Sequence, residues 1–93
     1  MDLRFYIDPE TDEPHIWEHG VSEDEVAQVL RAPLEDRAGR DGARIALGQS
    51  ASGRYLRVVY VLDSTPGSAF VITAFELGPK AKRALRRRRR RRP

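Results

Sequence analysis

Two histidines, His15 and His19, lie four residues apart in a short segment that ends at Gly20. Histidine changes its charge near neutral pH and is therefore suited to moving protons. The spacing puts both rings on one face of a helix, which also suits zinc ligands, but no third ligand has a clear signal. We therefore expect no metal and no cofactor. His15 is the candidate general base, and His19 is expected to interact with free carbonyls at a helix end.

Two arginines and a tyrosine in predicted strands suit contact with a phosphate and a base. Alternation along residues 55–62 puts Tyr55 and Arg57 on one face, and Arg44 is expected to share that face if the strands pair in sequence order. Two guanidinium groups beside an aromatic ring would hold a phosphate and a stacked base. The alternative is ordinary pairing with surface carboxylates, worth less than about 1 kcal/mol per pair. The candidate catalytic set is His15, Arg44, Tyr55 and Arg57.

The charge is divided unevenly along the chain. Residues 1–79 hold all 14 acidic residues and have a net charge of −7, whereas residues 80–93 contain only basic charges and have +10, which together give the formal +3. A block of like charges needs an anionic partner or water around it. The candidate nucleic-acid-binding residues are Lys80, Lys82, Arg83, Arg86, Arg87, Arg88, Arg89, Arg90, Arg91 and Arg92.

Three interpretations of this basic end stay open. It binds phosphates without reading sequence, with an affinity that falls steeply as salt rises. It docks on acidic side chains of the same chain or of a second copy, or it is a solvated tail. The acidic residues considered for docking are Asp8, Glu10, Asp12, Glu13, Glu23, Asp24 and Glu25.

Length and composition restrict the class of protein. The 93 residues are enough for one domain, and the absence of cysteine excludes disulfides and a thiol nucleophile. No apolar run is long enough to span a membrane, and the acidic N-terminus lacks the apolar region of a signal peptide. We expect a small soluble protein of the cytoplasm.

The clearest structural signal is a helix over residues 23–31. Ser22 and Glu25 form a capping box, and Val21 and Val26 have the spacing of a hydrophobic staple. Three acidic residues in the first turn suit the helix dipole, and Pro33 ends the pattern.

The remaining elements complete an α+β fold. Strands are expected at residues 3–7, 43–49, 55–62 and 69–77, a short helix at 15–19, polar turns at 34–42, and a C-terminal helix from Pro79 to Arg90. The prediction is a short N-terminal strand, two helices, a three-stranded antiparallel meander and a basic C-terminal helix, with a domain at 1–79 and a basic end at 80–93. Trp17 is expected in the core, and Phe70 and Phe75 on opposite faces of their strand.

Several segments resemble the BrnT-type toxins of the RelE/ParE-like superfamily. They are Asp8-Pro9, then His19-Gly20-Val21-Ser22 before the capped helix, and Gly48-Gln49-Ser50 with Gly53-Arg54 before a valine-rich strand. The resemblance covers about residues 3 to 85. It implies a sheet that cradles RNA, a cognate antitoxin protein as partner, and RNA cleavage without a metal.

The chain departs from the family pattern where positive charge is expected. Thr11 and Glu18 stand at lysine positions, His15 at an asparagine position, and Phe70 and Phe75 at arginine positions. We therefore expect a toxin-like domain that interacts with RNA or the ribosome, with metal-independent endoribonuclease activity left open. The alternative is a non-enzymatic module whose basic end pairs with acidic surfaces, including those of a second copy in a homodimer.

Overall fold

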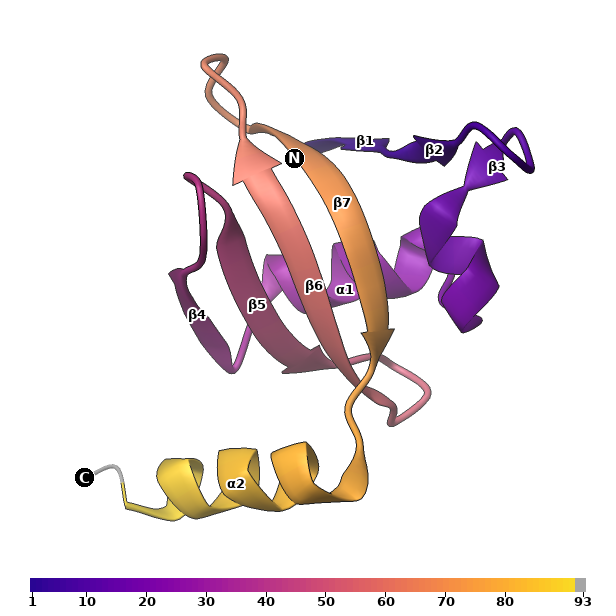
Figure 1. Cartoon of the computed structure of the whole chain (residues 1–93). Helices are drawn as coiled ribbons and strands as arrows, with labels where there is room; N and C mark the ends of the chain where they lie inside the picture. The colour runs from indigo at the N-terminus through magenta and orange to yellow at the C-terminus, as the bar shows by residue number, and fades with distance from the viewer. Residues whose placement is uncertain (92–93) are drawn as a thin grey trace.

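A five-stranded mixed sheet forms the centre of the computed structural model, which describes residues 1–91 (Figure 1). Its order is β1-β7-β6-β5-β4, with β1 parallel to β7 and the other neighbours antiparallel. The strands are β1 Asp2–Phe5, β4 Glu35–Ala38, β5 Arg44–Gln49, β6 Tyr55–Leu62 and β7 Ser68–Glu76. A separate two-stranded ribbon pairs β2 Ile7–Asp8 with β3 Glu13–Pro14.

The helices are those that the sequence predicts. They are the 3₁₀ helix η1 His15–His19, α1 Glu23–Arg31 and α2 Pro79–Arg90. Gly20 ends η1 in the left-handed conformation, with φ of 69°. At the start of α1, Ser22 Oγ accepts a hydrogen bond from the Glu25 N–H, and the Glu25 carboxylate accepts one from the Ser22 N–H. The α+β class and the capping box are therefore confirmed.

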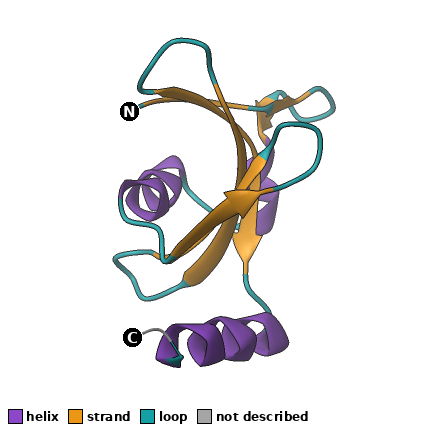
Figure 2. Cartoon of the chain, turned by 90° about the vertical axis from the view of Figure 1, so that its left-hand side faces the viewer, coloured by secondary structure: helices purple, strands orange, loops and turns teal. Residues whose placement is uncertain are grey.

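The main core lies between α1 and one face of the sheet, and Figure 2 shows α1 and α2 at separate sites around the sheet. Val26 and Val29 of α1 pack against Leu56, Val58 and other buried strand residues. A β-carbon added at Gly48 would lie 2.9 Å from Val29 Cγ1, so this glycine lets α1 approach β5 closely. A smaller apolar cluster, containing Leu47, Leu77 and Leu85, holds α2 against the other face.

The sheet is wider than the predicted three strands. The segment expected to form polar turns contains β4, which pairs with β5 and forms one edge of the sheet. Its sequence, Glu-Asp-Arg-Ala, has no apolar alternation, and charged residues are typical of edge strands. On the other edge, β1 pairs in parallel with β7, a long-range contact that sequence order does not reveal.

Two expectations about aromatic residues were wrong. Trp17 does not enter the core, because this residue is 48 % exposed. Its indole N–H donates a hydrogen bond to Glu23 Oε1 at 2.7 Å. Phe70 and Phe75 face the same side, because Phe70 pairs with Val61 and Phe75 with Arg57. A bulge between these pairs adds one residue to β7, and this reverses the alternation of side chains.

Candidate nucleic-acid interface

The helix α2 packs on the sheet and presents its basic side chains from a fixed position. Gly78 is its N-cap, Pro79 starts its first turn, and Leu85 is fully buried. Lys82 Nζ and Arg86 Cζ lie 5.6 Å and 5.4 Å from the centre of the Tyr55 ring. Both distances allow attraction between a cation and the ring face, so Tyr55 supports α2 and is not an open stacking surface.

The C-terminal half of α2 is joined to the segment that contains β4. Arg88 donates from Nε and Nη2 to the two oxygens of Glu35, at 2.8 Å and 3.0 Å. The hydrogen bonds from Arg88 hold the pKa of Glu35 below its ordinary value, although partial burial opposes this shift. Arg89 Nη1 donates to the Leu34 carbonyl at 2.8 Å. The basic end thus docks on its own chain, but not on the acidic residues that the sequence suggested.

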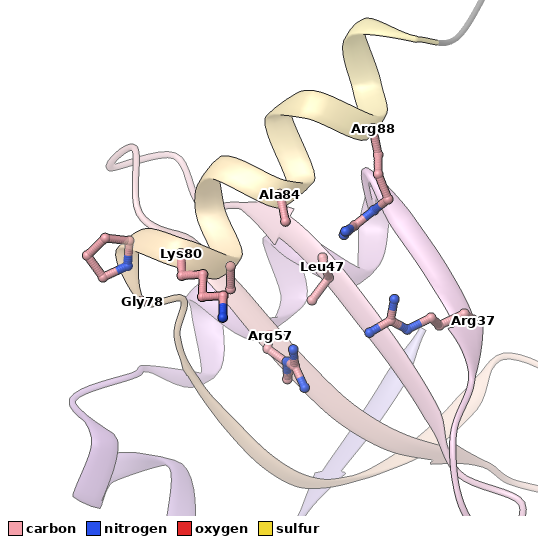
Figure 3. Close-up of a pocket in the computed structure, with 9 residues that line it drawn as sticks. Arg37, Leu47, Arg57, Gly78, Lys80, Ala84 and Arg88 are labelled. Atoms are coloured by element: carbon pink, nitrogen blue, oxygen red, sulfur yellow. The ribbon is translucent and has the colours of Figure 1, made fainter.

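A pocket of about 510 Å³ lies between the start of α2 and the sheet (Figure 3). Four cationic side chains line it: Arg37 from β4, Arg57 from β6, and Lys80 and Arg88 from α2. No acidic side chain of the described chain lines it, and its floor contains Leu47 and the alanines of α2. Positive charge from three elements therefore converges on one hollow.

Arg57 has an unmet hydrogen-bonding requirement in this pocket. Its Nε atom is buried and has no hydrogen-bond partner within residues 1–91. Its guanidinium carbon lies 5.8 Å from the centre of the Phe75 ring. Most buried polar atoms in proteins are hydrogen-bonded, so this Nε is an exception that adds little to the stability of the fold.

A row of aromatic rings continues from Phe75 away from the pocket. The His19 ring lies 5.8 Å from Phe75, His15 lies 5.1 Å from His19, and Tyr6 lies 6.1 Å from His15, each pair edge to face. His15 and His19 are therefore in contact, as their spacing predicts. His15 Nδ1 also lies 3.4 Å from the Asp8 carboxylate.

Arg44 does not join Arg57 and Tyr55, contrary to the expectation of a shared face. It pairs with Tyr60, whose side chain belongs to the core beneath α1, whereas Arg57 pairs with Leu47 on the opposite face. Arg44 Nε donates to Asp36 Oδ1 at 2.9 Å, and Tyr60 donates to the same carboxylate. The hydrogen bond to Asp36 raises the pKa of Arg44. The register, which sequence alternation alone cannot supply, places Arg44 in a structural pair.

The candidate residues of the basic end have different environments. Lys80 and Arg88 line the pocket, Lys82 and Arg86 lie over Tyr55, and Arg89 binds a backbone carbonyl. The other described candidates are Arg83, Arg87, Arg90 and Arg91, all of them exposed, and Arg92 lies outside the described residues. Among the basic residues from Lys80 to Arg91, only Arg88 forms an ion pair with a carboxylate of the described chain.

Arg37 is the pocket residue that sequence reasoning missed. It lies in the segment read as polar turns, and no motif marks it. Its place follows from the pairing of Arg37 with Ile45 across β4 and β5. No family model, curated protein or solved structure matches this chain.

Proposed function

We propose that this protein is a small RNA-binding domain that grips the phosphate backbone with the pocket and α2. The observation that carries the proposal is a pocket lined by four cationic side chains and by no acidic side chain of the described residues. A phosphate oxygen accepts strong, charge-assisted hydrogen bonds from guanidinium groups. An RNA phosphate in the pocket would balance the charge of Arg57, which has no carboxylate partner in the described residues, and would reduce the repulsion among its basic neighbours.

The exposed side of α2 extends this surface. Arg83, Arg87 and Arg90 are exposed and recur at intervals of four and three residues, so they follow one side of the helix. None of them has a carboxylate partner in the described part of the chain. Unpaired cations along a rigid helix are suited to successive phosphates and to binding that does not depend on base sequence.

The toxin-like part of the proposal rests on the sequence. We infer a RelE/BrnT-like arrangement from Asp8-Pro9, the His-Gly-Val-Ser segment and the capped helix α1. In that arrangement the target would be RNA or the ribosome in the cytoplasm, and a cognate antitoxin protein would regulate the domain. No helix in residues 1–91 is long and apolar enough to cross a membrane.

Metal-independent RNA cleavage is the second candidate function, and Arg57 carries it. A cleavage site needs preorganised cations around the reacting phosphate, which the pocket supplies. It also needs a general base, and His15 and His19 are connected to Arg57 only through the Phe75 ring. Because the four candidate catalytic residues do not converge, RNA binding without cleavage is the function that the geometry supports better.

Binding of a short fluorescein-labelled single-stranded RNA, measured by fluorescence anisotropy over a series of KCl concentrations, tests the first proposal. Arg57→Met should weaken binding at least roughly fivefold, because a charge-assisted hydrogen bond is lost. The salt slope should decrease by about 0.7 for each phosphate contact removed. Arg31→Met is the matched control, since it removes the same charge from an exposed position on α1. Equal losses of RNA affinity in Arg57→Met and Arg31→Met would contradict a specific role of the pocket in RNA binding.

Two further measurements separate the rival functions. Incubation of RNA with the protein in EDTA tests cleavage, and Arg57→Met should stop any cleavage that occurs. Sedimentation of wild type and of a triple variant, Arg83→Gln with Arg87→Gln and Arg90→Gln, tests the interaction module. If the triple variant changes oligomeric size but leaves RNA affinity intact, the basic helix serves protein association instead.

A further inference from the structure

A second cluster of chemically active side chains lies at the far end of the row of rings from Arg57. It contains Asp8 from β2 and His15 and Glu18 from η1. One ligand atom from each residue lies within 4.8 Å of the other two. The side chains of Asp8 and His15 are 15 % and 29 % exposed, and that of Glu18 is 44 % exposed. The cluster is therefore half-buried, yet accessible to a small ion.

The distances within the cluster are long for hydrogen bonds and suitable for coordination. His15 Nδ1 lies 3.4 Å from Asp8 Oδ2 and 3.4 Å from Glu18 Oε2. Good N–H···O hydrogen bonds measure about 2.7–3.2 Å. Ligand atoms bound to one tetrahedral zinc at about 2.0–2.2 Å lie roughly 3.3–3.6 Å apart. The imidazole nitrogen thus already lies at a zinc-ligand separation from each of the two carboxylate oxygens, and the two oxygens lie within 4.8 Å of each other.

Hydrogen bonds with backbone groups hold Asp8 and His15 in place without using their ligand atoms. Asp8 Oδ1 accepts from the Glu10 N–H at 2.9 Å, which leaves Oδ2 facing the imidazole. The His15 N–H donates to the Tyr6 carbonyl at 2.9 Å and so holds the start of η1 against the chain that leads into β2.

The spacing of His15 and Glu18 also agrees with their local structure. Residues i and i+3 of a 3₁₀ helix lie almost directly above one another, so η1 directs both side chains to one side. The sequence motif paired His15 with His19, but the His19 ring meets His15 edge to face and adds no ligand atom to the cluster. The third ligand is Asp8, which the β2–β3 ribbon supplies from seven positions earlier in the chain.

We propose that Asp8, His15 and Glu18 form a Zn²⁺ site with three protein ligands and water in the fourth position. One nitrogen and two carboxylate oxygens are a donor set that zinc accepts. The bound ion would join β2 to η1 and so stabilise the segment that leads into α1. This site is independent of the RNA-binding proposal, because none of its ligands lines the cationic pocket.

Isothermal titration calorimetry of the full-length protein, prepared without an affinity tag and stripped of metal with EDTA, tests the proposal. Zn²⁺ should bind with one-to-one stoichiometry and raise the melting temperature. His15→Gln and Asp8→Asn should each weaken Zn²⁺ binding by at least about tenfold. His19→Gln is the matched control, since it removes the neighbouring imidazole and should leave the Zn²⁺ affinity unchanged.

Glu18→Gln provides a test that does not depend on a buried residue. Glu18 is exposed, so this variant should keep the circular dichroism spectrum of the wild type in metal-free buffer and still lose Zn²⁺ affinity. The proposal is overturned if the wild type shows no Zn²⁺ binding, or if the affinity survives His15→Gln and Glu18→Gln. RNA binding by Glu18→Gln should equal that of the wild type, so the two proposals can fail separately.

Discussion

The arginines next to α1 have carboxylate partners, whereas those in the pocket beneath α2 largely do not. Arg44 bonds to Asp36, and Arg54 donates to both oxygens of Glu25. In the pocket, Arg37 and Arg57 have no carboxylate partner within residues 1–91, and Arg57 Nε has no hydrogen bond to any of those residues. The same residue type therefore occupies two kinds of environment on either side of one sheet.

This difference separates structural arginines from candidate binding arginines. A guanidinium whose hydrogen bonds are met within the fold contributes to stability and has little capacity left for a ligand. One that is partly buried and unpaired adds little stability, because its desolvation is not compensated. Such a group persists in a fold at some cost, which an external anion would offset. The comparison predicts opposite effects on stability and binding for substitutions on the two sides.

The largest expected effect concerns packing under α1. Gly48→Ala should destabilise the protein by about 1–3 kcal/mol, because the new β-carbon would lie 2.9 Å from Val29 Cγ1 in a closed core. Gly78→Ala, at the start of α2, meets no atom within 4 Å and should change stability by no more than about 1 kcal/mol. Urea denaturation measures both. Similar losses of stability for the two variants would show that the close contact with Val29 is not the cause of the loss at Gly48.

A pair of arginine substitutions tests the comparison directly. Arg54→Met should lower the free energy of unfolding by about 1–2 kcal/mol, because it leaves the half-buried Glu25 carboxylate without its partner. Arg57→Met should change the free energy of unfolding by less than about 0.5 kcal/mol, since no hydrogen bond of Arg57 Nε is lost. For RNA affinity we expect the reverse: Arg57→Met should lower the affinity more than Arg54→Met does. A large loss of stability in Arg57→Met would identify Arg57 as a structural residue.

The smallest effect is a pH dependence at the Arg88–Glu35 pair. The pKa of Glu35 is lowered in the folded state, so this pair contributes stability above its ordinary pKa of 4.5. That contribution should be lost as the pH falls from 4.5 through the lowered folded-state pKa. Denaturation of wild type and Glu35→Gln at several pH values measures this contribution. The difference in the free energy of unfolding between the two proteins should become smaller at acidic pH. Glu10→Gln, at an exposed carboxylate, is the control. If the difference in the free energy of unfolding between wild type and Glu35→Gln stays constant with pH, the Arg88–Glu35 pair is not the source of the pH dependence.

Sequence reasoning succeeded where structure depends on neighbouring residues. The capping box at Ser22 predicted α1 with the bounds that are observed, and Gly20 and Pro79 correctly marked a helix end and a helix start. These signals act within a few residues and involve the backbone groups that every helix terminus leaves unpaired.

Sequence reasoning failed where the structure depends on contacts between residues far apart in the chain. The strand β4 exists because the edge of β5 offers hydrogen bonds to it, although its own sequence resembles a turn. The bulge in β7 moved Phe75 to the face of Phe70, and the pairing register moved Arg44 away from Arg57. A shift of one residue reverses every side chain of a strand, so register errors change a predicted site completely.

Local sequence determined where the helices of this protein begin and end, and composition determined that a strongly basic helix would follow an acidic domain. Only the tertiary structure decided which cations are free. It paired Arg44 with Asp36 and Arg88 with Glu35, and it left Arg57 unpaired in a pocket completed by Arg37. The ends of a helix depend on residues within about one helical turn of each other. An ion pair or a pocket requires segments that meet only after the sheet has formed.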